Sequence, residues 1–222
     1  MATKRLVSGW WVLLFLVALV ACGGDAASSR SIPGGGDALF WDTFGPDVPG
    51  PWLLEGDDVG QTAVINQQLV ITINQPNTLQ FSTLQDQSFT DFSLEVDTRQ
   101  LAGSPESSFG LLARMQNNDQ FYRFDITGSG LFMIMRRNGD GTWTQFKQDW
   151  TASEAINQGL NGVNRLKLVA QGSRISFYAN DILLQQIDDV IFPTGAIALN
   201  AGTFGQPGLQ VAFDNVVVRP AP

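Results

Sequence analysis

Short runs of β-branched and aromatic residues alternate with turn residues from position 39 to position 219, and no eleven-residue window there carries the apolar stripe of an amphipathic helix. Within the run at 92–97, apolar and polar side chains alternate, which puts Glu95 and Asp97 together on the polar face of a strand. The pattern therefore predicts an all-β region. Its expected strands span residues 68–74, 92–100, 109–116, 120–127, 131–137, 143–148, 165–170, 174–179, 182–187, 196–200 and 210–218.

Turns rich in Asn, Asp and Gly separate these strands at intervals of about ten residues, a spacing typical of antiparallel sandwiches. We therefore predict an antiparallel two-sheet β-sandwich of jelly-roll type. A single helical turn, capped by Ser153, is expected at 153–158. No internal repeat or second change of composition interrupts 39–219, so this region is expected to be one domain.

The amino terminus has the pattern of a secretory signal peptide, expected to span residues 1–21. Lys4 and Arg5 precede an apolar run at 6–20, which is short for a membrane-spanning helix. The sequence Leu-Val-Ala-Cys at 19–22 resembles the bacterial lipobox, which implies that Cys22 is lipidated and becomes the new amino terminus. A plain signal peptide or a short uncleaved anchor is the alternative.

The segment at 22–38 is rich in Gly and Ser and is interpreted as the lipidated Cys22 followed by a flexible tether. Loss of residues 1–21 leaves 11 basic and 21 acidic groups. An anionic membrane surface repels such a body, so the lipid chains are the expected attachment. These features predict an exported protein on the bacterial cell membrane or envelope, with its domain facing outside the cytoplasm.

Composition excludes several kinds of chemistry. The 222 residues include no histidine and one cysteine, and the formal net charge is −8. Without histidine there is no Ser-His-Asp or Cys-His catalysis and no His-ligated zinc, and a single cysteine forms no disulfide framework. The acidic balance argues against a nucleic-acid partner, which requires a concentrated basic surface.

The order of several segments resembles the concanavalin A-like lectin/glucanase group, which includes laminin-G-like domains, family 16 glycoside hydrolases and 3-keto-disaccharide hydrolase-like domains. The resemblance covers about residues 39–219. It is carried by FWDTF at 40–44, Trp52, FSLEVDTR at 92–99, FGLLARMQNNDQFYRFDI at 109–126, RLKLVAQGSRISFYANDILLQQIDD at 165–189 and VAFDNVVV at 211–218. It implies a sandwich that serves lectins, enzymes and structural modules alike.

Family 16 hydrolases carry a Glu-x-Asp-x-Glu or Glu-x-Asp-x-x-Glu strand, and Glu95 and Asp97 match its first two positions. Thr98, Arg99 and Gln100 follow, so the carboxylate of the acid/base is missing. Hydrolysis by that mechanism is therefore not expected. Asp125, on a neighbouring predicted strand, is an alternative proton donor.

The expected ligand-binding residues are polar side chains on one sheet face together with one tryptophan. Cross-strand ion pairs on a solvated face are the alternative role for the charged ones. Trp41 and Trp52 are expected to fill the core, whereas Trp150 is left open between core and surface. The predicted binding set is Glu95, Asp97, Arg114, Arg123, Asp125 and Trp143.

Asp42 and Asp214 occupy positions that resemble the calcium ligands of related sandwiches, where the first and last strands meet. A structural calcium ion is one role for them, and an Asx turn or a strand-end hydrogen bond is the other. No other cofactor is expected.

Together these observations predict a membrane-anchored lipoprotein whose sandwich is a non-catalytic recognition module for carbohydrate. Two alternatives stay open. One is a family 16-like glycoside hydrolase, and the other is a structural or sensory ectodomain that contacts a protein of the cell envelope.

Overall fold

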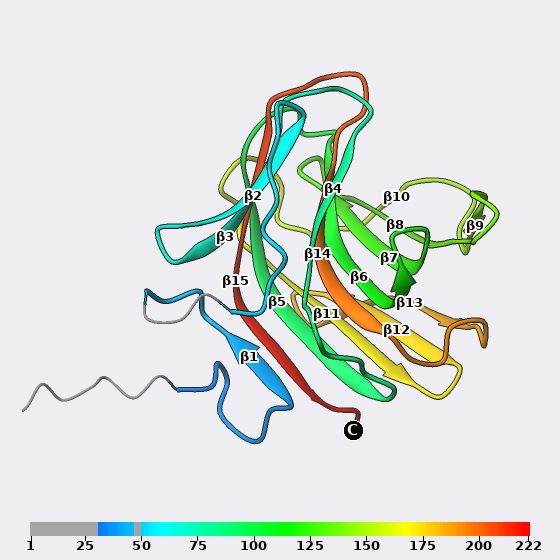
Figure 1. Ribbon diagram of the computed structural model, residues 1–222. Coiled ribbons are helices and arrows are strands. Elements are labelled where there is room, and N and C mark those ends of the chain that lie inside the picture. The colour runs from blue at the N-terminus through cyan, green and yellow to red at the C-terminus, as the bar shows by residue number, and fades with distance from the viewer. Residues whose placement is uncertain (1–30, 47–49) are drawn as a thin grey trace, which may run out of the picture. The chain divides into compact units, whose positions relative to one another are not determined.

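The structure is a computed structural model that describes residues 31–46 and 50–222. This part of the chain contains fifteen β-strands and no helix. All the strand pairings are antiparallel. The strands form two layers that face each other, as Figure 1 shows. The predicted antiparallel β-sandwich is confirmed.

The first layer, called sheet A, has the strand order β13-β12-β11-β5-β15-β3-β2, and β1 pairs with β15. Its strands are β1 (Phe40–Asp42), β2 (Gly60–Ile65), β3 (Gln68–Ile73), β5 (Phe92–Ala102), β11 (Asn164–Gln171), β12 (Arg174–Ala179), β13 (Ile182–Asp188) and β15 (Leu209–Pro220). β5 and β15 lie near its centre and pair with each other.

The second layer, called sheet B, has the order β10-β8-β7-β6-β14-β4, and β9 pairs with β8. Its strands are β4 (Leu79–Thr83), β6 (Ser108–Asn117), β7 (Gln120–Thr127), β8 (Leu131–Arg137), β9 (Trp143–Gln145), β10 (Thr151–Ala152) and β14 (Ala196–Gly202). Each sheet thus has an inner face toward the other sheet and an outer face away from it.

The core lies between the two inner faces. Phe92, Leu94 and Val96 of β5 point into it, as period-two alternation predicts. Rings from opposite sheets meet there, and the centroids of Phe124 on β7 and Phe177 on β12 are 5.2 Å apart. The remaining side chains of these strands therefore project from the outer faces, where ligands have access.

The residue types at the turn explain the β12–β13 hairpin. Asn180 and Asp181 have φ angles of 49° and 66° and join β12 to β13, as their residue types predict. The helical turn expected at 153–158 is absent, so that prediction is wrong. Ser153 instead closes a short turn, in which its Oγ accepts a hydrogen bond from the backbone N–H of Ala155 at 3.2 Å.

Candidate functional site

The predicted ligand-binding residues do not share one face. Glu95 and Asp97 project from the outer face of sheet A, whereas Arg123 and Asp125 project from the outer face of sheet B. Arg114 lies at one end of the sandwich. The prediction of a common face is wrong because β5 and β7 belong to different sheets, which alternation along each strand does not reveal.

Glu95 and Asp97 make cross-strand ion pairs with β11. The Nζ of Lys167 lies 3.2 Å from Oε1 of Glu95, and the Nε of Arg165 lies 2.9 Å from Oδ1 of Asp97. The pairing register places these partners directly opposite each other. The two carboxylates thus form the ion pairs of the alternative on a partly solvated face, and their role in ligand binding stays a prediction.

Arg114 connects three loops and turns of the sandwich through hydrogen bonds. Its side chain is buried, and it donates hydrogen bonds to the carbonyl oxygens of Thr90 (2.8 Å), Gly172 (2.9 Å) and Phe192 (3.3 Å). Burial lowers the pKa of Arg114 from its usual value. Its predicted role as a ligand contact is therefore replaced by a structural one, because its donors hold backbone groups of the loops and turns that close the sandwich.

Three buried polar side chains lie side by side on the outer face of sheet B and are called the Arg123 cluster: Arg123, Asp125 and Asn200. Asn200 on β14 and Asp125 on β7 both stand opposite Gly110 on the intervening β6. Arg123 is 8% exposed, and the other two are completely buried. The Nη2 of Arg123 lies 2.5 Å from Oδ2 of Asp125 and donates to Oγ of Ser108 at 3.0 Å.

The Arg123 cluster has unused hydrogen-bonding capacity. Among the described residues, neither side-chain oxygen of Asp125 and neither side-chain polar atom of Asn200 has a hydrogen-bond partner, and the Nε of Arg123 also has none. The close contact of Arg123 with Asp125 is an ion pair by distance, but its angles do not form a hydrogen bond. Each such buried group costs about 1–3 kcal/mol unless something else satisfies it.

Gly110 fixes the spacing within this cluster. A Cβ atom at this position would collide with the carbonyl oxygen of Phe124 on the neighbouring strand. Because Gly110 has no side chain, β6 lies close to β7, and no side chain stands between Asp125 and Asn200.

Trp143 borders the Arg123 cluster and is 37% exposed. It lies on β9 opposite Arg137, whose Cζ is 5.1 Å from the centroid of the indole ring. The Cζ of Arg123 is 5.9 Å from the same centroid, and the ring of Phe121 packs edge-on at 5.9 Å. Two cations and an aromatic edge therefore hold this ring in place while part of it faces solvent.

A second aromatic pair belongs to the same sheet. The ring of Trp150, just before β10, packs edge to face against Phe204, just after β14, with centroids 6.1 Å apart. Trp150 is half-buried and Phe204 is 44% exposed. The sequence left the position of Trp150 open and did not indicate Phe204, because the contact joins segments more than fifty residues apart.

The other two tryptophans of the described residues lie near β1. Trp52 is buried against Phe40 and Phe44 as expected, whereas Trp41 on β1 is only half-buried and does not join the core, so the expectation for Trp41 is wrong. The Nε1 of Trp52 donates to Oδ2 of Asp42 at 3.1 Å.

Asp42 forms an Asx turn, one of the two roles expected for it, because its Oδ1 accepts a hydrogen bond from the backbone N–H of Phe44 at 2.7 Å. Asp214 lies on β15, where burial raises the pKa of its carboxyl group. Among residues 31–46 and 50–222, no group of three or more Asp, Glu, Cys or His side chains is placed to hold a metal ion. Calcium binding by Asp42 and Asp214 stays a prediction.

Residues 1–30 lie outside the described part of the chain, and the predictions that fall there concern the signal peptide, Cys22 and most of the tether. Within the described part, no helix has the length and apolar character needed to cross a bilayer.

No protein-family model matches the chain, and no curated protein matches it. Solved structures do match. The carbohydrate-binding module CBM66 from Bacillus subtilis is 19% identical, with a TM-score of 0.62 over 77% of this chain and 96% of that one. A β-glucanase from Bacillus licheniformis is 13% identical, with a TM-score of 0.57 over 84% and 99%.

An endo-β-1,3-glucanase from Pyrococcus furiosus is 12% identical, with a TM-score of 0.58 over 82% of this chain and 94% of that one. At these identities the likeness shows the fold alone. The described domain thus shares the jelly-roll fold of these structures, the fold that the resemblance seen in the sequence implies.

Proposed function

We propose that the domain recognises carbohydrate on the outer face of sheet B, without hydrolysing it. The observation that carries this proposal is the Arg123 cluster, whose buried polar atoms lack hydrogen-bond partners beside the partly exposed ring of Trp143. A sugar offers an apolar ring face for stacking and hydroxyl groups that both donate and accept. Trp143 supplies the stacking surface, and the guanidinium of Arg123, positioned by Asp125, supplies donors.

The solved structures with this fold support the proposal, because they include one named a carbohydrate-binding module and two named glucanases. The proposal of recognition without hydrolysis rests on the carboxylates. The strands of sheet B carry one carboxylate, Asp125, which is buried and paired with Arg123. Retaining hydrolysis needs two carboxyl groups about 5–5.5 Å apart. Glu95 and Asp97 lie on the other sheet.

Trp143→Ala is expected to weaken binding of the full chain to its oligosaccharide by roughly tenfold or more, since an aromatic anchor at the centre of a site contributes the most. A panel of neutral β-glucan and fructan oligosaccharides, screened by isothermal titration calorimetry, identifies the sugar and measures the loss. The matched control is Trp41→Ala, a tryptophan on β1 of sheet A, which leaves the affinity unchanged. Equal affinities of the wild type and a folded Trp143→Ala variant would refute the proposal.

We propose in addition that Cys22 carries the lipid that holds the protein on a bacterial membrane. Support comes from the apolar run at 6–20 and the Leu-Val-Ala-Cys sequence that ends at Cys22. Mass spectrometry of the protein from bacterial membranes is expected to show cleavage before residue 22 and an acyl adduct on Cys22, and Cys22→Ala is expected to release the protein from the membrane fraction. An unmodified Cys22 in an uncleaved chain contradicts this anchor.

A further inference from the structure

The outer face of sheet A carries a polar groove made of three adjoining cavities of about 620, 190 and 330 Å³. The first two cavities share Gln68, Arg99, Asp214 and Asn215, and the second and third share Asp97 and Val163. The groove therefore crosses β3, β15, β5 and β11 in sheet order and ends at the β12–β13 turn. At about 4.8 Å per strand this path is roughly 19 Å long.

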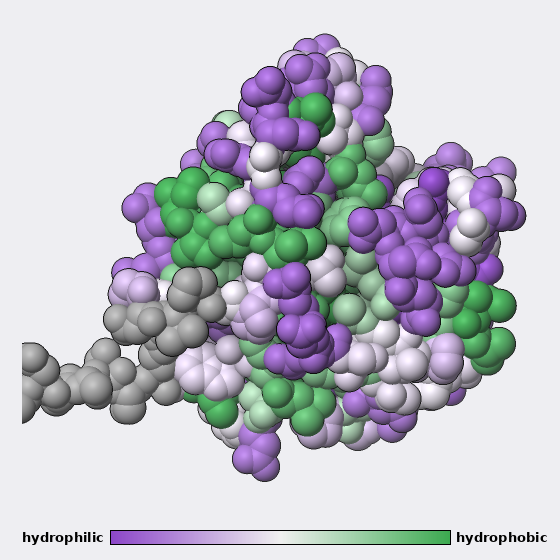
Figure 2. Space-filling view, viewed as in Figure 1, coloured by the Kyte–Doolittle hydropathy of each residue, from purple (hydrophilic) through white to green (hydrophobic). Residues whose placement is uncertain are grey.

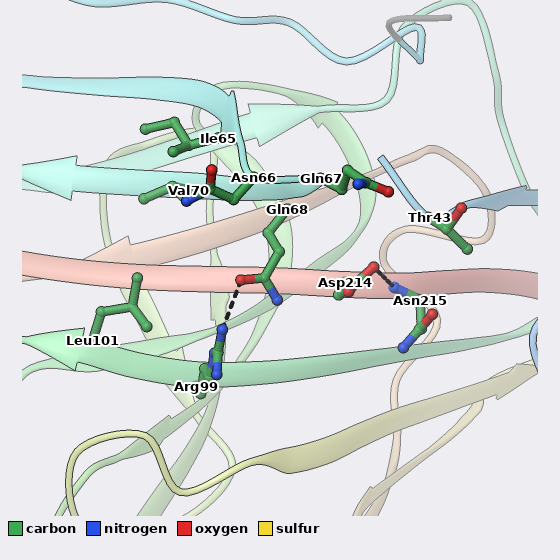
Figure 3. A pocket seen from close by; sticks show the side chains of 10 residues that line it. All are labelled: Thr43, Ile65, Asn66, Gln67, Gln68, Val70, Arg99, Leu101, Asp214 and Asn215. Carbon is green, nitrogen blue, oxygen red and sulfur yellow. Dashed lines mark hydrogen bonds between the residues drawn. The ribbon is translucent and has the colours of Figure 1, made fainter. Parts of the chain in front are cut away.

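A β-bulge in β15 directs polar groups into this groove. Asp214 pairs with Asp97 and Val217 pairs with Glu95, so one extra residue is accommodated between them. Asn215 takes a left-handed conformation with φ of 53°, while the next residue, Val216, points into the core. As a result Asp214 and Asn215 both line the groove, which Figure 3 shows.

The groove contains fixed groups with spare hydrogen-bonding capacity. The Nη2 of Arg99 donates to Oε1 of Gln68 at 2.9 Å, as drawn in Figure 3, while the Nε of Arg99 is buried and has no partner among the described residues. Asn215 Nδ2 donates to Oδ2 of Asp97 at 2.9 Å. Burial raises the pKa of Asp214, and the nearby charge of Asp97 adds to this effect. The groove thus presents both donors and acceptors.

Charge and lining indicate the chemical class of the ligand. Two cations, Arg99 and Arg165, face three carboxylates, Asp97, Asp181 and Asp214, so the groove disfavours an anionic ligand. Aliphatic side chains complete the surface. At one end the β2–β3 hairpin exposes Ile65, which is 43% accessible. Figure 2 shows a hydrophobic patch at the left, on the side where Figure 1 places this hairpin.

We propose that this groove is a second binding site, for a linear neutral oligosaccharide, on the face opposite Trp143. Hydroxyl groups of such a chain hydrogen-bond the carboxylate and amide side chains of Asp214, Gln68 and Asn215, and the C–H groups of the sugar rest on Val70 and Leu101. The residues that line the groove include no aromatic ring, so hydrogen bonds dominate and the affinity is lower than at the Trp143 face.

Two sites on opposite faces make the domain bivalent. A protein of this kind bridges two polysaccharide chains, and its avidity for a polymer exceeds its affinity for a short oligosaccharide. The groove does not depend on the Trp143 face, because no residue lines both.

NMR titration of the full chain tests this inference, in a detergent without a sugar headgroup because of the apolar run at 6–20. The probes are laminaripentaose, cellopentaose, maltopentaose and a levan pentasaccharide. At least one is expected to shift the Nε–H signal of Arg99 and the side-chain amide signals of Gln68 and Asn215. Arg99→Ala weakens this binding roughly tenfold, whereas Arg174→Ala, an exposed arginine of β12 outside the groove, does not change it.

Trp143→Ala separates this inference from the function proposed for sheet B. The groove signals are expected to shift in that variant as they do in the wild type, even if the Trp143 face binds nothing. Two results overturn the inference: groove signals that none of the four sugars moves up to its solubility limit, or groove shifts that disappear in Trp143→Ala and therefore report binding elsewhere.

Discussion

Arg114→Ala is expected to lower the free energy of unfolding by about 3–5 kcal/mol, because it leaves three backbone carbonyls without their charged donor and opens a cavity between the sheets. Those carbonyls belong to Thr90, Gly172 and Phe192, which come from three separate connections of the sandwich. Arg114 is among the largest completely buried side chains. Urea unfolding followed by tryptophan fluorescence measures the loss.

Arg174→Ala is the matched control for this substitution, since the exposed Arg174 lies at the start of β12 and its removal costs at most about 0.5 kcal/mol. For Arg114→Lys, the loss in free energy of unfolding is expected to lie between those of the two alanine variants, because an ammonium group reaches fewer of the three carbonyls. At a temperature where Arg114→Ala is folded, its oligosaccharide affinity stays that of the wild type. Lost affinity with an unchanged unfolding free energy would return Arg114 to the ligand site predicted from the sequence.

The alternation along single strands could be predicted because it is local. The inward position of Phe92, Leu94 and Val96 and the outward position of Glu95 and Asp97 follow from a period of two, and the structure has them so. Sheet membership is not local. It depends on which strands pair, and β5 pairs with β11 and β15 rather than with β6, its successor in the chain.

The Arg123 cluster also combines residues that local patterns reveal with one that only strand pairing reveals. Arg123 and Asp125 could be found because they are the two charged residues of β7. Asn200 was missed, since it faces Asp125 only through the register of β14, β6 and β7. A signal was present: Asn200 is a lone amide in the run AIALNAG, at a position that alternation turns away from the core.

The bulge of β15 also left a trace in the sequence. Phe213 and Val216 both enter the core, although an odd separation of three residues would send them to opposite faces of a regular strand. Two consecutive polar residues, Asp214 and Asn215, fill the interval. This break in period two predicts an extra residue and two polar side chains on one face, the arrangement that lines the groove of sheet A.

Arg123→Ala is expected to destabilise the domain by about 3–5 kcal/mol, since it leaves Asp125 charged, buried and without a cation. The double variant Arg123→Met/Asp125→Leu removes both charges, and its new side chains meet the apolar Leu112, Met133 and Met135 of the neighbouring strands. We expect it to equal the wild type or exceed it by about 1–4 kcal/mol. Both variants lose oligosaccharide binding on the Trp143 face. Chemical denaturation measures the free energy of unfolding, and calorimetry measures the affinity for the oligosaccharide.

The matched control is Lys167→Met/Glu95→Leu, which removes a partly exposed ion pair from sheet A and changes stability by about 1 kcal/mol or less. It leaves binding on the Trp143 face intact. If the buried ion pair destabilises the fold but is needed for binding, binding explains why the pair is present. If the pair stabilises the fold, stability alone explains it. A folded Arg123→Met/Asp125→Leu variant that still binds the sugar, or one as unstable as Arg123→Ala, would therefore assign the Arg123 cluster to the architecture of sheet B rather than to recognition.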